Sequence, residues 1–368
     1  MAVTTDDSSP SLRALEAWLQ PRLTGASDLH LELHGKPGSG FSAETSILSA
    51  TWIAGETDHA ERFVLRKETP DPPVYPTQVP GIEIEIEIQY RVMEAITAGA
   101  SRRAAISVPI APLYGYEPDP SVLGTPFFVM GFVDGVVPIE SPMYTLEGFF
   151  TEISAESRRT MIDDGVRMMA GVHAIDWRQA GLQWLTEGAT PSIARQSELW
   201  RAYSDRELNG RIHPPLERAW QWLDENRPPE PEPSLCWGDP RPGNVIWHED
   251  RAACVTDFEA AAIAPAEIDL GWWLMFDRWA HETSGVERLV GEPTRAEQTA
   301  LYEQLSGRTV GDTLWYEVFA AARYCAIVVR VMNRLVLRGH MPADQTVWID
   351  NPVVPCLEQL LVEGAISR

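Results

Sequence analysis

One short segment constrains this chain more than any other: two apolar runs flank a polar loop, and a third apolar run follows. The loop carries Asp239 and Asn244, five positions apart, and the third run ends at Asp257, thirteen positions further on. Apolar runs of this length predict short strands, and the turn between the second and third predicts a hairpin. We therefore expect the three polar side chains to meet at one place.

The three side chains suit phosphoryl transfer. Asp239 can orient an attacking hydroxyl and accept its proton, while Asn244 and Asp257 offer the oxygen ligands that Mg²⁺ prefers. Asp, Asn, Pro and Gly also favour ordinary turns, so a plain loop is the alternative interpretation. The order, the spacing and the flanking apolar runs favour catalysis.

The composition predicts a chain with a packed core. It has 368 residues, 44% of them hydrophobic, which is enough for two domains or two lobes. With 30 basic and 53 acidic residues, the formal charge is −23, so we expect neither nucleic acid nor an anionic membrane as a partner. The acidity favours a cationic substrate, although its first effect is solubility.

The cysteines and the apolar runs bear on the compartment. The four cysteines are widely spread and form no CxxC pair, so we expect neither a disulfide framework nor a zinc ribbon. Residues 1–10 lack the basic-then-apolar pattern of a signal peptide, and no apolar run is long enough for a membrane span. These features predict a protein of the reducing cytoplasm.

The first third of the chain has the pattern of a small sheet with one helix. Helical spacing covers 11–23, and a glycine-rich turn at 38–42 precedes strand-like runs. The predicted strands are 46–53, 61–66 and 125–133. The run 82–88 alternates like a strand, but it continues without a breaker, and we expect a helix through most of 82–98.

Helical patterns dominate the rest. The predicted helices are 156–175, 193–208, 215–225 and 314–337, with one last helix within 347–368. A strand-rich island at 235–258 interrupts them and carries the polar loop. The expected fold class is therefore α+β, with a sheet-containing part followed by a mainly helical part.

Taken together in this order, the motifs resemble the aminoglycoside phosphotransferase and choline kinase family, distant relatives of protein kinases. The family pattern is HGDxxxxN followed by an aspartate, and Trp237-Gly238-Asp239, Asn244 and Asp257 match it except that Trp237 replaces the histidine. Further matching segments are a third strand at 63–66, a hinge at 127–135, a helix end at 171–176 and an aspartate-containing helix at 269–273. The version here is similar to the kinase-like domain of some acyl-CoA dehydrogenases, on the segment ending at Trp200 and the 272–273 tryptophan pair.

The resemblance covers most of the chain and implies a protein-kinase-like, two-lobe fold. Its parts would be an N-terminal helix segment (1–27), a nucleotide-binding lobe (28–134) and a helical lobe with the catalytic loop and acceptor site (135–368). The implied activity moves the γ-phosphoryl group of Mg-ATP, with GTP as an alternative donor, to a hydroxyl of a small molecule. That acceptor could be aminoglycoside-like or another hydroxylated metabolite.

The resemblance also implies roles for single residues. Asp239 would be the catalytic base, and Asn244 and Asp257 the Mg²⁺ ligands. Arg66 would bind the phosphates in place of the usual lysine. Strand alternation favours Arg66 over Lys67, because the two side chains point to opposite faces of the strand. The predicted nucleotide contacts are Gly40 and Ser42 of the glycine turn and Met130, Gly131 and Val133 of the hinge. Glu85, Glu87 and Gln89 all remain candidates for the partner of Arg66.

Other residues are expected to support the site. His173 and Asp269 would be structural, with Asp269 bracing the loop, and the tryptophans at 272, 273 and 279 would belong to the core. The competing hypothesis is a nucleotide-binding scaffold that has lost catalysis, because Trp237, Arg66 and Gln89 depart from the pattern. Retention of the base and both metal ligands favours an active enzyme. A protein kinase is a weaker option because no APE motif follows Asp257, and the oligomeric state stays open.

Overall fold

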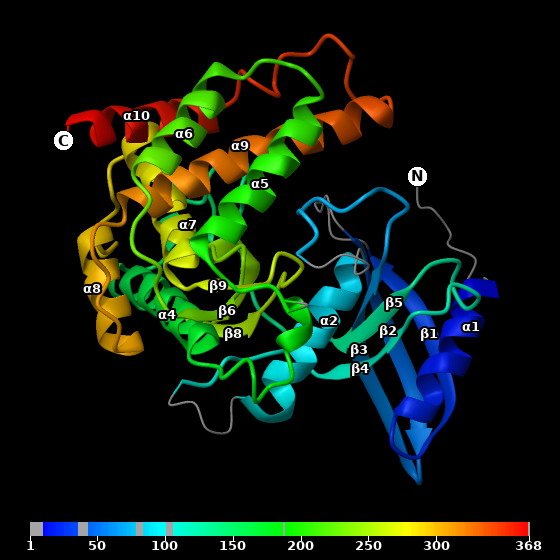
Figure 1. The fold of residues 1–368 in the computed structure, drawn as a ribbon. Coiled ribbons are helices and arrows are strands. Elements are labelled where there is room, and N and C mark those ends of the chain that lie inside the picture. Colours follow the sequence, from blue (N-terminus) through cyan, green and yellow to red (C-terminus); the bar gives the residue numbers. More distant parts are fainter. Residues whose placement is uncertain (1–9, 36–42, 79–83, 101–105, 187, 367–368) are drawn as a thin grey trace.

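A five-stranded antiparallel sheet forms the first part of the fold, in the order β1-β2-β3-β5-β4 (Figure 1). Its strands are β1 Ala26–Gly35, β2 Glu44–Ala54, β3 Thr57–Lys67, β4 Leu113–Glu117 and β5 Phe127–Gly131. The computed structural model describes residues 10–35, 43–78, 84–100, 106–186 and 188–366. The predicted glycine turn, with Gly40 and Ser42, lies outside the described residues.

The alternation of side chains along the strands explains how helices cover this sheet. Phe127 and Val129 of β5 face the apolar side of α1 (Pro10–Leu19), which leads into a short 3₁₀ turn, η1 (Gln20–Arg22). Phe128 points to the opposite face and packs on α2 (Glu85–Ala95). The alternating run is thus helical from Glu85 onward, as expected, and it ends in a π-helical turn, η2 (Ile96–Ala100).

Helices make up most of the second part (Figure 1). The long helix α9 (Leu314–Leu337) runs through it and packs against four others. These are α5 (Ile193–Leu208), α6 (Pro214–Glu225), α7 (Glu267–Arg278) and α10 (Val353–Ile366). Further helices of this part are α3 Phe149–Glu152, α4 Ala155–His173, η3 Gln183–Leu185 and α8 Arg295–Ser306, with α8 packed on α4. None of the described helices is long and apolar enough to cross a membrane.

Two short antiparallel pairs build the predicted strand-rich island. β6 (Pro233–Cys236) pairs with β9 (Ala262–Pro265), and β7 (Val245–His248) pairs with β8 (Arg251–Val255). A 3₁₀ turn, η4 (Pro242–Asn244), leads into β7. The polar loop therefore lies between β6 and β7, which fixes both of its ends.

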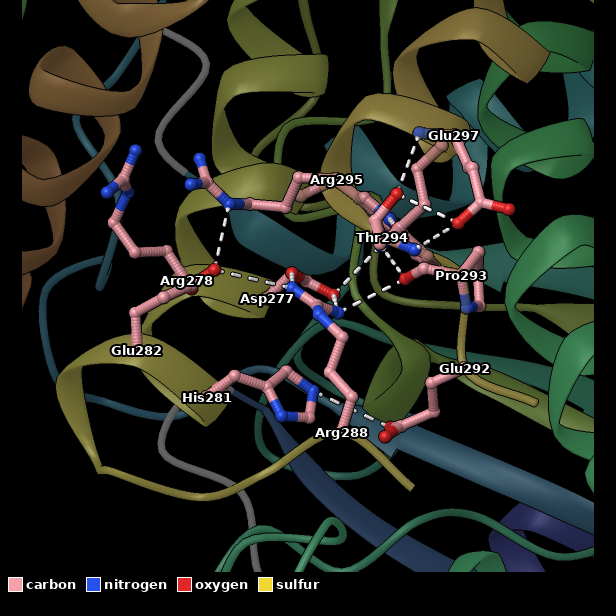
Figure 2. A network of polar contacts seen from close by, with 12 residues as sticks. Asp277, Arg278, His281, Glu282, Arg288, Glu292, Pro293, Thr294, Arg295 and Glu297 are labelled. Atoms are coloured by element: carbon pink, nitrogen blue, oxygen red, sulfur yellow. Dashed lines mark hydrogen bonds and ion pairs between the residues drawn. The ribbon is translucent and has the colours of Figure 1, made fainter. Parts of the chain in front are cut away.

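A network of buried charged and polar side chains holds α7 on the face that carries Asp277 and Trp273. Figure 2 shows Asp277 of α7 paired with Arg288, whose Nη1 donates to Oδ2 at 2.9 Å. Gln298 of α8 donates to the same oxygen at 2.9 Å and accepts from the Trp273 indole at 2.6 Å. A second pair, His281 Nε2 to Glu292 Oε1 at 3.6 Å, closes the loop after the π-helical turn η5 (Trp279–Thr283). These contacts fix the rotation of α7, so that its other face points to the polar loop.

A proline-rich segment between β3 and α2, here called the strap (residues 71–78), ties the sheet-containing part to the helical part. Arg330 of α9 donates to the carbonyl oxygens of Pro72 at 2.7 Å and Pro73 at 3.1 Å. Tyr203 of α5 donates to the Val74 carbonyl at 2.5 Å. The strap is thereby held as one conformation over α5 and α9.

Glu85 fixes the strap from the α2 side, and its protonation predicts a pH effect. Its carboxylate accepts from the Val74 amide at 2.6 Å, and burial raises its pKa from 4.5 to about 7. Because the folded state binds the proton more tightly than the unfolded chain, stability falls as the pH rises from about 4.5 to 7.

Glu85→Gln removes this titration and keeps an acceptor oxygen for Val74. Urea titrations measure the free energy of unfolding of both proteins at pH 5 and pH 8. The difference between variant and wild type should be up to about 3 kcal/mol more favourable to the variant at pH 8 than at pH 5. Glu56→Gln, in the exposed β2–β3 turn, is the control and should show no such gain. Equal pH profiles for Glu85→Gln and wild type would contradict the prediction.

Candidate active site

Asp269 of α7 anchors the polar loop through two backbone amides. Its Oδ2 accepts from Trp237 N at 2.6 Å and its Oδ1 from Gly238 N at 3.1 Å. His173 Nε2 lies 3.0 Å from the same carboxylate, and His173 Nδ1 lies 2.8 Å from the Tyr302 hydroxyl. The structural roles predicted for His173 and Asp269 agree with these contacts.

Gly238 is needed at the start of the loop. Its φ is +94°, and a Cβ built there would lie 2.1 Å from the carbonyl oxygen of Ala260. Any side chain would push the loop away from the backbone at Ala260, just before β9. Trp237, which stands where the pattern has histidine, is fully buried and donates from its indole to Thr256 O at 2.7 Å. It therefore joins the loop to the end of β8.

The carboxylate of Asp239 is buried and firmly oriented. Asn244 Nδ2 donates to its Oδ2 at 2.8 Å and to its backbone carbonyl at 2.9 Å. Trp272 of α7 donates from its indole to Oδ1 at 2.7 Å. Trp272 belongs to the core as predicted, being 1% exposed, but its hydrogen bond to Asp239 had no signal in the sequence.

Two further side chains contact Asp239, and the sequence analysis missed both. The strap brings the Tyr75 hydroxyl to 3.1 Å from Oδ2. Arg241 Nε lies 3.1 Å from each carboxylate oxygen, and its Nη1 pairs with Glu140. Tyr75 lies in a loop without periodicity, and Arg241 lies in a segment whose composition is typical of a turn. Their contacts with Asp239 therefore become visible only in the folded structure.

The environment of Asp239 tunes its acidity. Burial raises its pKa to about 7, and the charges of Asp257 and Glu259 act in the same direction. The hydrogen bonds from Asn244 and Trp272 oppose this rise. A carboxylate whose pKa is near neutrality is well matched to accept a proton at physiological pH.

Asp257 lies two residues beyond β8 in a left-handed conformation, with φ +57°. Its Oδ1 is 3.4 Å from Arg66 Nη1 and 3.3 Å from Gln89 Nε2. Gln89 also donates to Glu259 at 3.1 Å. A strained backbone at a residue with several polar partners is typical of functional sites.

The partner of Arg66 differs from the three candidates on α2. Glu85 binds the strap, and Glu87 pairs with Arg91 at 3.1 Å. Gln89 turns toward the same carboxylate oxygen as Arg66. Arg66 therefore meets Asp257 directly, which places the predicted phosphate-gripping residue beside a predicted metal ligand.

The donor set fits a magnesium ion with phosphate groups. Asp257 and Asn244 provide hard oxygen donors, as Mg²⁺ requires. Among the described residues, two buried polar atoms at this place have no hydrogen-bond partner: Arg66 Nε and Gln89 Oε1. A cationic nitrogen and an amide oxygen left in this way suit an anionic group and its metal ion.

The segment predicted to be the hinge, 127–135, comprises β5 and the four residues that follow it. Gly131 N donates to Pro112 O at 2.7 Å, and Phe132 N donates to Arg62 O at 3.0 Å. Met130 is half-buried and packs toward both α2 and the helical part. The adenine contacts expected of Met130, Gly131 and Val133 stay predictions, as do the phosphate contacts expected of Gly40 and Ser42.

Comparison with known families identifies the chain. Residues 46–306 match the model of the family described as "Phosphotransferase enzyme family". The chain belongs to this family. The match includes the polar loop, Asp257 and Asp269, so the described geometry lies within the family's own region. The expected resemblance is confirmed at this level.

Curated relatives carry the name acyl-CoA dehydrogenase family member. The chain is 29% identical over 223 residues to member 11 from Gallus gallus, which is 60% of this chain and 26% of the relative. It is 24% identical over 365 residues to member 11 from Pongo abelii, which is 94% of this chain and 42% of the relative. The chain thus spans less than half the length of these relatives.

Solved structures confirm the kinase-like fold. A Ralstonia eutropha protein named as an aminoglycoside phosphotransferase superposes with a TM-score of 0.71 at 24% identity, covering 96% of this chain and 98% of that one. Macrolide 2'-phosphotransferase MphH from Brachybacterium faecium gives 0.53 at 17% identity, covering 94% and 99%. Aminoglycoside phosphotransferase APH(4)-Ia, in a ternary complex with ADP and hygromycin B, gives 0.53 at 13% identity, covering 96% and 99%. At these identities the likeness concerns the fold.

Proposed function

We propose that this protein is an ATP-dependent phosphotransferase that moves the γ-phosphoryl group to a hydroxyl of a small molecule. The observation that carries the proposal is the buried Asp239 carboxylate, held by Asn244 and Trp272 in one site with Asp257 and Arg66. Asp239 orients the acceptor hydroxyl and takes up its proton.

Asn244 and Asp257 would hold Mg²⁺, which neutralises charge on the phosphates when bound. Arg66 lies beside Asp257 and contributes a fixed positive charge for the same phosphates. ATP is the proposed donor, with GTP as an alternative, and Met130, Gly131, Val133, Gly40 and Ser42 are the proposed nucleotide contacts. The APH(4)-Ia complex with ADP supports a nucleotide in this family's fold.

The two parts of the fold have different proposed roles, nucleotide binding in the sheet-containing part and catalysis in the helical part. We propose that residues 28–134 form the nucleotide-binding lobe, that 135–368 hold the catalytic loop and the acceptor, and that 1–27 form a separate helical segment. The charge of −23 supports a small-molecule partner over nucleic acid or a membrane, and a cytoplasmic setting remains our proposal.

Thermal unfolding with ATP, with and without Mg²⁺, tests the nucleotide site. Ligand at 100 times its dissociation constant should stabilise the wild type by about 2.7 kcal/mol. Asp257→Ala should lose the part that depends on Mg²⁺, because a carboxylate ligand is removed. Asp312→Ala, in the loop before α9, is the control: it loses the bond from Leu314 N and starts from a lower stability, but its shift with ATP and Mg²⁺ should equal that of the wild type. No stabilisation of the wild type at millimolar ATP would contradict the proposal.

A scaffold without catalysis is the second candidate, favoured by one observation. Arg66, in place of the usual lysine, is engaged by Asp257. Such a scaffold would still bind nucleotide in the thermal assay but would transfer no phosphate to any acceptor. Turnover that depends on both Mg²⁺ and an acceptor excludes it.

A further inference from the structure

A group of aromatic rings extends from Asp239 along α7 and α9, and the proposed chemistry does not use it. Trp272 binds Asp239, and Phe276 and Trp279 follow four and seven positions later, on the same helical face. Tyr324 of α9 lies against all three, with ring centroids 5.8 Å from Trp272, 5.0 Å from Phe276 and 5.7 Å from Trp279. These four residues are called the aromatic wall.

The wall opens toward solvent with distance from the base. Trp272 is 1% exposed, whereas Phe276, Trp279 and Tyr324 are only partly buried. Seven residues of helix correspond to about 10 Å. The outer end coincides with the π-helical turn that starts at Trp279, and such turns are frequent at functional sites. The three outer rings are therefore partly open to solvent, while the inner ring is enclosed beside the Asp239 carboxylate.

The charges at the wall decide what kind of molecule it accepts. The Arg241 guanidinium carbon lies 5.8 Å from the Phe276 ring centroid. Buried Arg323 lies 4.6 Å from the Trp272 centroid and 4.5 Å from that of Trp200. Positive groups of the protein thus already occupy cation–π positions on Phe276 and Trp272, and an ammonium group brought to those two rings would meet like charge. Glu140, which could attract a cation, is ion-paired with Arg241.

We propose that the aromatic wall is the acceptor subsite and that the acceptor is a hydroxylated molecule with an apolar body and no cationic group. The inference rests on the proposed phosphotransferase function. The Tyr75 hydroxyl, 3.1 Å from Asp239 Oδ2, marks a place beside the base where an acceptor hydroxyl can be held.

The chemistry at this subsite balances without a further reactant. The acceptor oxygen bonds to the γ-phosphorus of the nucleoside triphosphate, and the bond from that phosphorus to the β–γ bridging oxygen breaks. The nucleoside diphosphate leaves with the bridging oxygen. The proton of the acceptor hydroxyl passes to Asp239.

Calorimetry on protein saturated with AMP-PNP and Mg²⁺ tests the subsite. The probes are 1-alkanols and 3-hydroxyalkanoates of four to ten carbons, with choline and kanamycin A as cationic hydroxyl compounds. Affinity should rise about twofold per methylene group, since each is buried on one side only. Choline and kanamycin A should bind more weakly than the ten-carbon probes.

Variants of the wall locate the effect. Phe276→Ala and Trp279→Ala should each weaken binding of the ten-carbon probes about tenfold, which corresponds to the loss of one partly buried ring. Their affinity for AMP-PNP should stay at the wild-type value. Trp222→Ala, at a partly buried tryptophan of α6 whose ring lies against Gly364 of α10, is the matched control and should change neither affinity.

Two results would overturn the inference in different ways. If AMP-PNP binds but affinity is independent of chain length, or choline or kanamycin A binds more tightly than the ten-carbon probes, the subsite assignment is wrong and the phosphotransferase proposal stands. If AMP-PNP does not bind at millimolar concentration, both are wrong.

Discussion

Asp239→Asn is expected to reduce phosphoryl transfer by about 10²- to 10⁴-fold, the usual contribution of a positioned base. Asparagine keeps the size of the side chain and an oxygen that can accept from the Trp272 indole. It cannot take up the hydroxyl proton. The measurement is acceptor-dependent release of ADP, and nucleotide binding in the presence of Mg²⁺ should persist because Asn244 and Asp257 remain.

The control for this change is Asp250→Asn. Asp250 lies in the β7–β8 turn with φ +61°, a conformation that asparagine also tolerates, and it makes no contact with Asp239. Its activity should equal that of the wild type. An Asp239→Asn protein that keeps more than about a tenth of the wild-type rate would contradict the role of Asp239 as the base.

The sequence predicted that Asp239, Asn244 and Asp257 lie in one site, and these three residues are joined by short segments of chain. Asp239 and Asn244 are five positions apart, and the β7–β8 hairpin returns the chain to Asp257. Alternation on β3 likewise pointed Arg66 toward the site, where it meets Asp257. Strand period and turn length are sufficient for Asp239, Asn244 and Asp257. For Arg66 alternation decides only the face of β3, and its contact with Asp257 arises from the packing of the sheet-containing part on the helical part.

The strap was not predictable in the same way. Tyr75 is 164 positions from Asp239 in the sequence. Arg330 and Tyr203 hold the strap through its backbone carbonyl oxygens. Because every residue has such a carbonyl, the sequence of the strap does not indicate these partners. An arginine on a helix ordinarily indicates a solvated face, and nothing local distinguishes Arg330.

Short elements with weak composition were also missed. β9 reads Ala-Ile-Ala-Pro, of which only Ile263 favours a strand, and it is recognised by its pairing with β6. β4 is similarly short. α8 was not predicted, although the sequence carries a signal for its start: Thr294 and Glu297 have the spacing of a capping box, which they form in the structure.

Asp269→Asn is expected to have the largest effect on stability. The carboxylate accepts from Trp237 N and Gly238 N and contacts His173, and all three partners are buried. Asparagine would place an NH₂ group against one of these donors. Leaving buried donors unpaired should cost about 3–5 kcal/mol, and for a chain of this length should lower Tm by about 5 °C.

Asp176→Asn is the matched control for that change, because Asp176 also accepts from two backbone amides, Arg178 N at 3.0 Å and Gln179 N at 3.1 Å. Asp176 is exposed, so water can replace the lost acceptor and the cost should stay near 1 kcal/mol or below. Chemical denaturation of both variants measures the difference. If Asp269→Asn costs no more than Asp176→Asn, the loop that carries Asp239 is held by other contacts. If it costs several kcal/mol more, the position of the base depends on one buried carboxylate of α7, the helix that also carries Trp272 and Phe276 of the aromatic wall.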